Sequence, residues 1–473
     1  MRRLLTTTTI YSLSAMLGPL VALLLTPIYV ATIGVAGYGV VDLVQTVVQL
    51  LIPMALWGLP TTLIARSTDS VHAQAPVPMF GGAMTLALLV SSVLSVVCIL
   101  LVAPMVAYAT QRPELNDLLR IYAYSLPFAA MYGVMVALMR LLGQVWRTVV
   151  LMVAYVGILA MCRLSWVVWF DTGVTGMIMA LTVTNAVVAL LGVVLSWRWW
   201  WARPDWTDVW QFVRLGAPLL PASLSVWMLL FIDRWFLVRY VSPLEQGQYA
   251  IAALVASLLA FVAEPFRQAW QPLARHQSDQ QFDVWSLTMY VAVALSVGAG
   301  VVTWAPELLV VIGGVDARAA APFIAGLIIA PLLSGVVAIV SMPAIRAQRT
   351  SRIAWATGTG ALVNIGLNIW LIPSYGAQGA AWATALAALS IPLVHIWLQR
   401  SAQAIPYDWV RLGGVIVLWC GYVGLIPLFA SSVAYRIAAL ICLIVCMGIV
   451  IQAWQWRQWV DLLSGLANDA PKR

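Results

Sequence analysis

Long apolar runs make up most of the chain, and glycine, proline or charged residues bound each of them. A membrane-spanning α-helix needs about 20 consecutive apolar residues, and these runs reach that length. They predict about fourteen spans, which in chain order cover residues 9–32, 39–64, 80–106, 118–142, 148–170, 176–198, 214–240, 248–271, 284–311, 320–345, 353–373, 379–399, 411–430 and 433–455. The pattern therefore predicts an all-α, polytopic membrane protein.

The composition agrees with this prediction. Of the 473 residues, 63% are hydrophobic and 9% are charged, whereas an average soluble protein carries about 25% charged residues. So few charged residues cannot cover a water-facing surface. The longest connections, 65–79, 199–213 and 273–283, are too short to fold as extramembrane domains. A separate catalytic domain is therefore not expected, and we predict that the chain is not an enzyme.

The arginines predict the orientation of the spans. With a cytoplasmic N-terminus, all but seven of the 25 Lys and Arg residues lie at cytoplasmic ends, as the positive-inside rule requires. The seven exceptions are Arg112, Arg120, Arg163, Arg234, Arg239, Arg318 and Arg436. An even number of spans places the C-terminus in the cytoplasm too. The net charge of +8 thus reflects topology, and no nucleic-acid partner is expected.

Three residue types limit the chemistry that the chain can perform. Lys472 is the only lysine and lies near the C-terminus, so a P-loop and a lysine Schiff base are excluded. The five cysteines lie inside apolar runs without histidines at ligand spacing, and the three histidines are isolated. We therefore expect no metal site and no cofactor.

Two pairs of glycine-containing motifs indicate an internal repeat. Residues 37–39 read Gly-Tyr-Gly and residues 247–249 read Gly-Gln-Tyr, and each motif follows an apolar run. Residues 173–176 and 376–379 both read Gly-x-x-Gly and follow later runs. Each pair is separated by six predicted spans, and six is an even number. The two repeats therefore keep the same orientation, which predicts a pseudo-twofold axis along the membrane normal.

This repeat predicts the domain organisation of the chain. Residues 1–203 form an N-terminal lobe of six helices, and residues 204–400 form a C-terminal lobe of six. Residues 401–473 add two further helices and a cytoplasmic tail.

Several motifs, taken in order, resemble a known family. Pro27-Ile28-Tyr29 ends the first span, 215–221 read Leu-Gly-Ala-Pro-Leu-Leu-Pro, and Asp233-Arg234 begins fifteen residues after the first proline of that segment. Residues 372–381 read Ile-Pro-Ser-Tyr-Gly-Ala-Gln-Gly-Ala-Ala. This order is similar to that of the polysaccharide transporter family, the Wzx-type flippases of the MOP superfamily, which also contains the MATE exporters.

The resemblance implies a function. Such a flippase moves undecaprenyl-diphosphate-linked oligosaccharide repeat units from the cytoplasmic to the periplasmic leaflet, by alternating access, for exopolysaccharide, capsule or O-antigen synthesis. It implies a bacterial cytoplasmic membrane, contact with membrane lipids, and a polysaccharide polymerase and a chain-length regulator as partners. Without a nucleotide-binding motif, transport would be coupled to H⁺, Na⁺ or the membrane potential.

Charged residues at bilayer depth are candidate functional residues, because each costs about 2.5–3.5 kcal/mol to insert. Arg163 lies in the predicted span 148–170 and has no acidic residue within helical reach. Three environments are possible for its side chain: a partner on another helix, a wet cavity that holds the substrate, or the membrane–water interface, which a long arginine side chain can reach.

Asp233 and Arg234 lie in the outer half of the span 214–240, and Arg239 follows. Adjacent residues on a helix point about 100° apart, so we expect Asp233 and Arg234 not to pair with each other. They either form salt bridges to other helices, with Asp233 acting in gating, or Arg234 and Arg239 attract the anionic diphosphate.

Glu264 and Arg267 are three residues apart, a spacing that permits an ion pair within one helix, and Pro265 between them is expected to kink it. The pair is either structural or a gate that changes partners, and Arg267 is also a candidate for substrate binding.

Two further charges lie near the ends of spans. Asp42 shares a helix face with Gln45 and Gln49 near the outer end of its span, and either binds H⁺ or Na⁺ or caps the interface. Arg140 ends the span 118–142 and either anchors it or attracts the diphosphate.

Other functions remain open at this stage. A MATE-like cation or drug antiporter would share the architecture, although the embedded arginines favour an anionic substrate. A lipid II flippase of the same superfamily carries cationic residues in its first helix, whereas 6–32 hold no charge here. A membrane glycosyltransferase would need acidic residues on a large loop.

Overall fold

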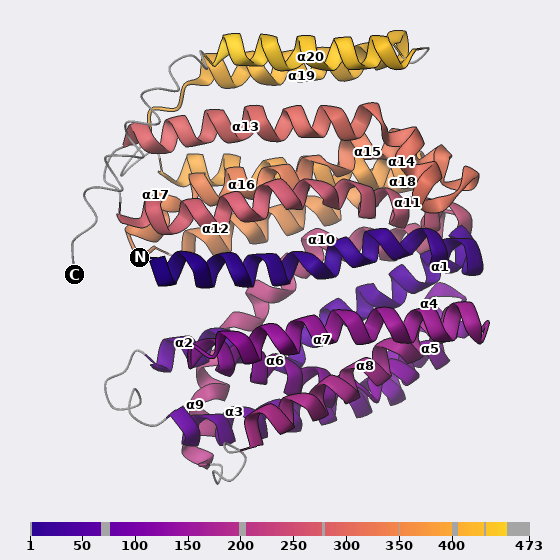
Figure 1. Ribbon diagram of the computed structural model, residues 1–473, viewed down its shortest axis with the longest axis vertical. Helices are drawn as coiled ribbons and strands as arrows, with labels where there is room; N and C mark the ends of the chain where they lie inside the picture. Colours follow the sequence, from indigo (N-terminus) through magenta and orange to yellow (C-terminus); the bar gives the residue numbers. More distant parts are fainter. Residues whose placement is uncertain are drawn as a thin grey trace. The chain divides into compact units, whose positions relative to one another are not determined.

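The computed structural model describes residues 2–67, 76–197, 205–276, 280–349, 351–399, 405–429 and 432–451. These residues form helices and no strands (Figure 1). The α-helices are α1 Arg2–Leu56, α2 Leu59–Ser67, α3 Pro76–Val97, α4 Ala103–Thr110, α5 Glu114–Ala123, α6 Leu126–Leu141, α7 Val145–Arg163, α8 Gly173–Ser196, α9 Trp206–Gly216, α10 Leu220–Tyr240, α11 Pro243–Ala256, α12 Ala260–His276, α13 Gln280–Thr303, α14 Ala305–Gly313, α15 Ala321–Leu327, α16 Ile329–Val340, α17 Met342–Arg346, α18 Ser351–Gln399, α19 Trp409–Phe429 and α20 Val433–Val450. Shorter π-helical and 3-10 segments are η1 Cys98–Val102, η2 Leu164–Trp169, η4 Ala217–Leu219, η5 Ser257–Leu259 and η6 Val315–Ala320. The all-α prediction is confirmed.

Most of these helices are long and apolar enough to cross a membrane. In the part of the chain that the structure describes, eleven helices pass this test, or twelve if the bent pair α5 and α6 forms one span. The chain is thus a multi-pass membrane protein. The predicted total of about fourteen spans is not confirmed and stays a prediction.

The two longest helices each contain a break at a glycine. Gly34 interrupts α1 with φ 74°, and Gly376 interrupts α18 with φ 54°. Glycine adopts a positive φ without a steric penalty, because it has no Cβ. Both breaks lie where the sequence predicts a boundary between spans, at 33–38 and 374–378. The breaks divide α1 and α18 into halves, and each half is long enough to cross the membrane on its own.

The chain divides into two compact units. Unit 1 comprises 1–255, 306–327 and 354–391, and unit 2 comprises 256–305, 328–353 and 392–473. The predicted lobes 1–203 and 204–400 with the final segment 401–473 stay a prediction. The predicted cytoplasmic tail lies outside the described residues, as do Arg198, Arg203 and Lys472.

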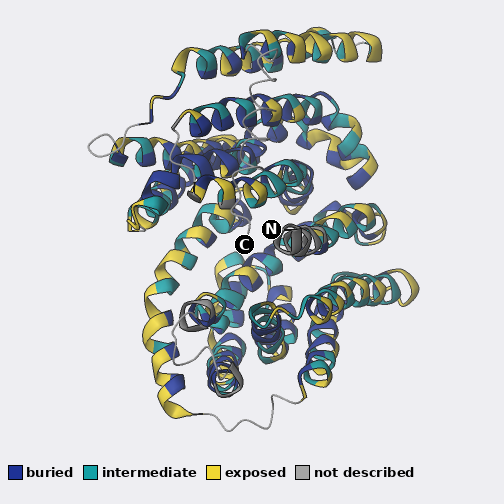
Figure 2. Cartoon of the chain, turned by 60° about the vertical axis from the view of Figure 1, so that its left-hand side comes forward, coloured by how far each residue is buried: buried dark blue, intermediate teal, exposed yellow. Residues whose placement is uncertain are grey.

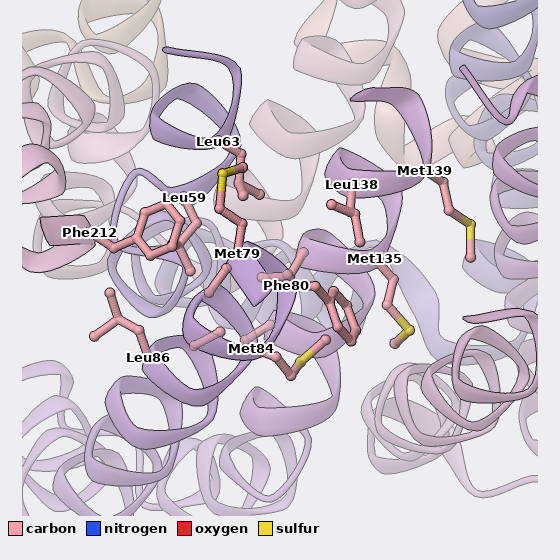
Figure 3. Packing of buried hydrophobic residues seen from close by; sticks show 14 of the residues in the cluster. Leu59, Leu63, Met79, Phe80, Met84, Leu86, Met135, Leu138, Met139 and Phe212 are labelled. Atoms are coloured by element: carbon pink, nitrogen blue, oxygen red, sulfur yellow. The ribbon is translucent and has the colours of Figure 1, made fainter. Parts of the chain in front are cut away.

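Unit 1 is held together by apolar packing. Figure 3 shows a cluster in which α2, α3, α6 and α9 converge. Leu59 and Leu63 of α2, Phe80 of α3, Leu138 of α6 and Phe212 of α9 are almost completely buried in it. Close van der Waals packing of these side chains anchors the amphipathic helix α9 to the other helices of the cluster.

Unit 2 contains a buried ion pair at the ends of its helices. Arg346 of α17 makes two hydrogen bonds to the carboxylate of Asp283 in α13, at 2.7 and 3.0 Å. Its guanidinium also donates to the carbonyl of Ala274 in α12, at 3.0 and 2.6 Å. The Asp283 side chain is fully buried. This arginine therefore joins three helices at one point.

The outer surfaces of the helices are apolar. Figure 2 shows exposed positions along many of the helices, and α19 and α20 are among them. Val417 and Ile441 on these two helices are 70% and 56% exposed. Helices that present apolar side chains outward are typical of membrane spans, whose surroundings are lipid.

Candidate functional site

A buried ion pair joins α1 to α10. Arg234 Nε of α10 donates to Asp42 Oδ2 of α1 at 3.0 Å. The side chains of Arg234 and Asp42 are 9% and 20% exposed, so water screens this interaction only weakly. Asp42 therefore has a cationic partner on another helix.

Asp233 also contacts Arg234, and this corrects the expectation that the two residues do not pair with each other. Arg234 Nη1 donates to Asp233 Oδ1 at 2.9 Å, and to the carbonyl of Leu230 at 3.0 Å. The long arginine side chain turns back along the helix, so its guanidinium reaches a carboxylate that its Cβ does not face. One arginine thus bridges two carboxylates.

Tyr249 completes this charge network. Its hydroxyl donates to Asp233 Oδ2, and its ring lies 5.6 Å from the guanidinium carbon of Arg234. Phe231 lies on the same guanidinium at 5.2 Å, and such cation–π contacts are favourable. Tyr249 was not among the candidate site residues predicted from the sequence. The one sequence signal that pointed to it is its position in the repeat motif 247–249.

The network contains more negative than positive charge. Asp42 and Asp233 are two carboxylates, whereas Arg234 is the one cation that bonds to them among the described residues. A buried charge without a partner is costly. The network thus has one more carboxylate than it has cations among the described residues.

The backbones of α1 and α11 approach closely beside this network. A Cβ on Gly39 would lie 2.8 Å from the backbone nitrogen of Gly247, and a Cβ on Gly247 would overlap the carbonyl oxygen of Val35. On the neighbouring helix α10, Trp227 Nε1 donates to the carbonyl of Thr46 at 2.8 Å. We call the contacts of α1 residues 35–46 with α10 and α11 the α1 seam. The two glycine motifs of the predicted repeat, 37–39 and 247–249, meet in it.

Residues next to Tyr249 tie α11 to two further segments. Glu245 Oε1 accepts a hydrogen bond of 2.9 Å from the backbone nitrogen of Ala377, directly after the break in α18. Gln248 Nε2 donates to the carbonyl of Asp316 in η6 at 2.7 Å. These bonds hold the start of α11, and with it Tyr249, in place.

Arg163 lies apart from the network, at the end of α7. Its Nε is buried and has no hydrogen-bond partner among the described residues. The side chain lines a cavity of about 170 Å³ together with Tyr29 and Tyr155. Of the environments that the sequence left open for Arg163, the structure thus provides a cavity.

The other candidate residues lie at exposed positions. Arg239 is exposed in the last turn of α10, and Arg140 is exposed at the end of α6, where its Nη2 lies 3.1 Å from the Met152 sulfur. Glu264 and Arg267 form the expected ion pair within α12, at 2.6 Å, with side chains 38% and 45% exposed. Within unit 1, the structure does not bring Arg239 or Arg140 to the α1 seam.

Sequence comparison assigns the family. The family of polysaccharide biosynthesis proteins matches residues 4–277, which is more than half of the chain. This chain belongs to the polysaccharide biosynthesis protein family. The matched segment includes Asp42, Arg163, Arg234 and Tyr249. Comparison with curated proteins gives no match.

Solved structures show which fold this polysaccharide biosynthesis protein has. The lipid II flippase MurJ in its inward closed conformation is similar, with TM-score 0.69 and 12% identity, over 96% of this chain and 100% of that one. A multidrug resistance MATE transporter of the MOP superfamily, inward-facing, has TM-score 0.61 and 15% identity, over 83% and 94%. The MATE multidrug transporter DinF-BH has TM-score 0.62 and 16% identity, over 85% and 96%.

At these identities the likeness concerns the fold. The protein has the fold of these solved flippase and transporter structures, as the sequence resemblance predicted. The three solved proteins are named as a flippase and as transporters, and none is named as an enzyme.

Proposed function

We propose that this protein is a flippase that carries undecaprenyl-diphosphate-linked oligosaccharide units from the cytoplasmic to the periplasmic leaflet of a bacterial cytoplasmic membrane. The family concerns polysaccharide biosynthesis, and the fold is one that a lipid flippase shares. The observation that carries the proposal is the buried bond between Asp42 and Arg234, which acts as a seal on the outer side of the transport path.

The positions of the two residues support a seal. Asp42 lies before residue 203 and Arg234 after it, so the ion pair joins segments of the two predicted lobes. Both residues lie in the outer halves of their predicted spans when the N-terminus is cytoplasmic. A contact between lobes near one membrane face closes that face, as alternating access requires.

The α1 seam combines tight backbone packing with an ion pair that can separate, and a seal needs both. The close approach of Gly39 and Gly247 leaves no room between the helices. The ion pair, by contrast, releases two charges into the path when the helices part. Water or an anionic headgroup then solvates Arg234, and water or a cation solvates Asp42. The excess negative charge of the closed network makes H⁺ or Na⁺ the proposed coupling ion.

Outer-side labelling tests whether the ion pair is a seal. Thr46→Cys places a reporter at a position that is 1% exposed, in a chain whose five native cysteines are replaced by serine. We expect Asp42→Asn and Arg234→Gln to raise labelling of this site by a membrane-impermeant maleimide added outside. Asp171→Asn and Arg318→Gln, at exposed positions, serve as matched controls. Equal labelling of all variants would contradict the seal.

A transport assay tests the substrate. In cells that lack the chromosomal copy, we expect the lipid-linked oligosaccharide to accumulate in the inner leaflet and polysaccharide display to be lost. A plasmid that encodes the wild-type protein should end this accumulation and restore polysaccharide display. A plasmid that encodes Arg234→Gln should do neither. Transport of a fluorescent organic cation that depends on Asp42, with normal polysaccharide display, would instead support the cation antiporter.

A further inference from the structure

A cavity in unit 1 lies between α1 and α7, and its α1 residues precede those of the α1 seam. Its volume is about 170 Å³. Gly18, Val21, Ala22 and Leu25 line it from α1, and Val156, Leu159 and Ala160 line it from α7. Apart from these apolar residues, the lining contains Tyr29, Tyr155 and Arg163. It is thus a mostly apolar cavity whose lining also contains one cation and two phenols.

Among the residues that the structure describes, no carboxylate pairs with the cation in this cavity. Arg163 Nε is buried without a hydrogen-bond acceptor among the described residues. The groups that interact with it electrostatically are the phenols of Tyr29, Tyr38 and Tyr155, and no carboxylate is among them. Buried charges are normally paired with an opposite charge. An anion is therefore the kind of ligand that suits this site.

The size of the cavity limits what this anion is. Pockets for small organic ligands have about 300–1,000 Å³, and one water occupies about 30 Å³. A cavity of about 170 Å³ has room for a phosphate group and a short apolar segment. The apolar walls match a hydrocarbon chain, and tyrosine hydroxyls can donate to phosphate oxygens.

We propose that this cavity binds the phosphate–isoprenoid junction of the polyprenyl lipid carrier, with Arg163 on the phosphate and the apolar wall on the first isoprene units. The proposal rests on the proposed function, because it names the part of that substrate which the site recognises. Recognition at this end leaves the glycan outside the cavity. The protein would then bind carriers with different glycans similarly well.

Binding of lipid phosphates to the purified full-length protein tests this site. The probes are undecaprenyl monophosphate, undecaprenol without phosphate, and inorganic diphosphate, each titrated while tryptophan fluorescence is recorded. We expect the wild type to bind the lipid phosphate more tightly than either other probe. Arg163→Ala is expected to weaken lipid phosphate binding about tenfold or more, because a hydrogen bond to a charged group is lost.

Matched variants separate a role in binding from a role in folding. Arg163→Lys keeps the charge and is expected to bind better than Arg163→Ala. Ala160→Leu fills the cavity from the apolar side and should weaken binding without removing a charge. Arg318→Ala, on exposed η6, should bind like the wild type. If Arg163→Ala does not fold, Ala160→Leu decides the question.

Two results would overturn the proposal. One is equal affinity of the wild type, Arg163→Ala and Ala160→Leu for undecaprenyl monophosphate. The other is tighter binding of inorganic diphosphate than of the lipid, which would show a site for a free anion. If the lipid phosphate binds at Arg163 but no lipid-linked oligosaccharide is translocated in cells, the proposed function fails while the site stands.

Discussion

Replacing Arg234 is the most direct test of the charge network. Arg234→Gln keeps much of the side-chain shape but removes the charge that bonds to Asp42 and Asp233. The side chains of Arg234 and Asp233 are 9% and 3% exposed, so water cannot replace the lost bonds. Removing one partner of a buried ion pair costs about 3–5 kcal/mol. We expect a loss of this size in the free energy of unfolding.

The effect of Asp42→Asn should be smaller. It removes one of two carboxylates and leaves Asp233 and Arg234 as a neutral pair. In Arg234→Gln alone, the carboxylates of Asp42 and Asp233 both lose their arginine. In the double variant Asp42→Asn with Arg234→Gln, only the carboxylate of Asp233 does. We therefore expect the two substitutions to be non-additive, with a coupling energy of about 0.5–3 kcal/mol.

Unfolding of the purified protein in lipid–detergent micelles measures these values, and its 24 tryptophans supply the fluorescence signal. Arg318→Gln, at an exposed position, controls for the loss of an arginine and should stay within about 0.5 kcal/mol of the wild type. If the Asp42 and Arg234 substitutions add within about 0.5 kcal/mol, the two residues do not interact in the folded protein, and the seal has no physical basis.

Three further substitutions test other parts of the structure by the same unfolding measurement. Gly39→Ala places a Cβ 2.8 Å from the backbone of α11 and should cost about 1–3 kcal/mol, whereas Gly157→Ala, in open space, should cost nothing; equal effects would refute the close approach. Arg346→Gln removes the cation that makes two hydrogen bonds to the fully buried Asp283 and should cost about 3–5 kcal/mol; a change below about 0.5 kcal/mol would show that this pair does not hold unit 2 together. Glu264→Gln breaks an exposed pair and should change stability by no more than about 0.5 kcal/mol; a large loss would mean that the pair is buried in the membrane-embedded protein.

The sequence was sufficient for the fold class and for several boundaries. Apolar runs of spanning length predict helices because backbone groups in lipid must bond within their own segment. The boundaries at Gly34 and Gly376 were predictable because glycine tolerates a positive φ there. The spacing of Glu264 and Arg267 predicted their ion pair, since residues three apart share a helix face.

The sequence also marked the charged residues of the candidate site, because charges are rare in apolar runs. It did not identify their partners. Asp42 and Arg234 are 192 residues apart, and no local pattern indicates that they meet. The expectation that Asp233 and Arg234 do not pair was wrong, because it considered Cβ directions and not the reach of a guanidinium.

What the sequence alone determined is thus local: helices, their breaks, and charges placed at an energetic cost inside the membrane. Only the tertiary structure decided that Asp42, Asp233, Arg234 and Tyr249 form one network, whereas Arg163 faces a cavity without a carboxylate. The physical reason is that a charge in an apolar run needs a partner of opposite charge or polarity, and the packing of the helices determines which group lies close enough to be that partner. That packing depends on contacts between residues far apart in the chain, such as those of Gly39 with Gly247.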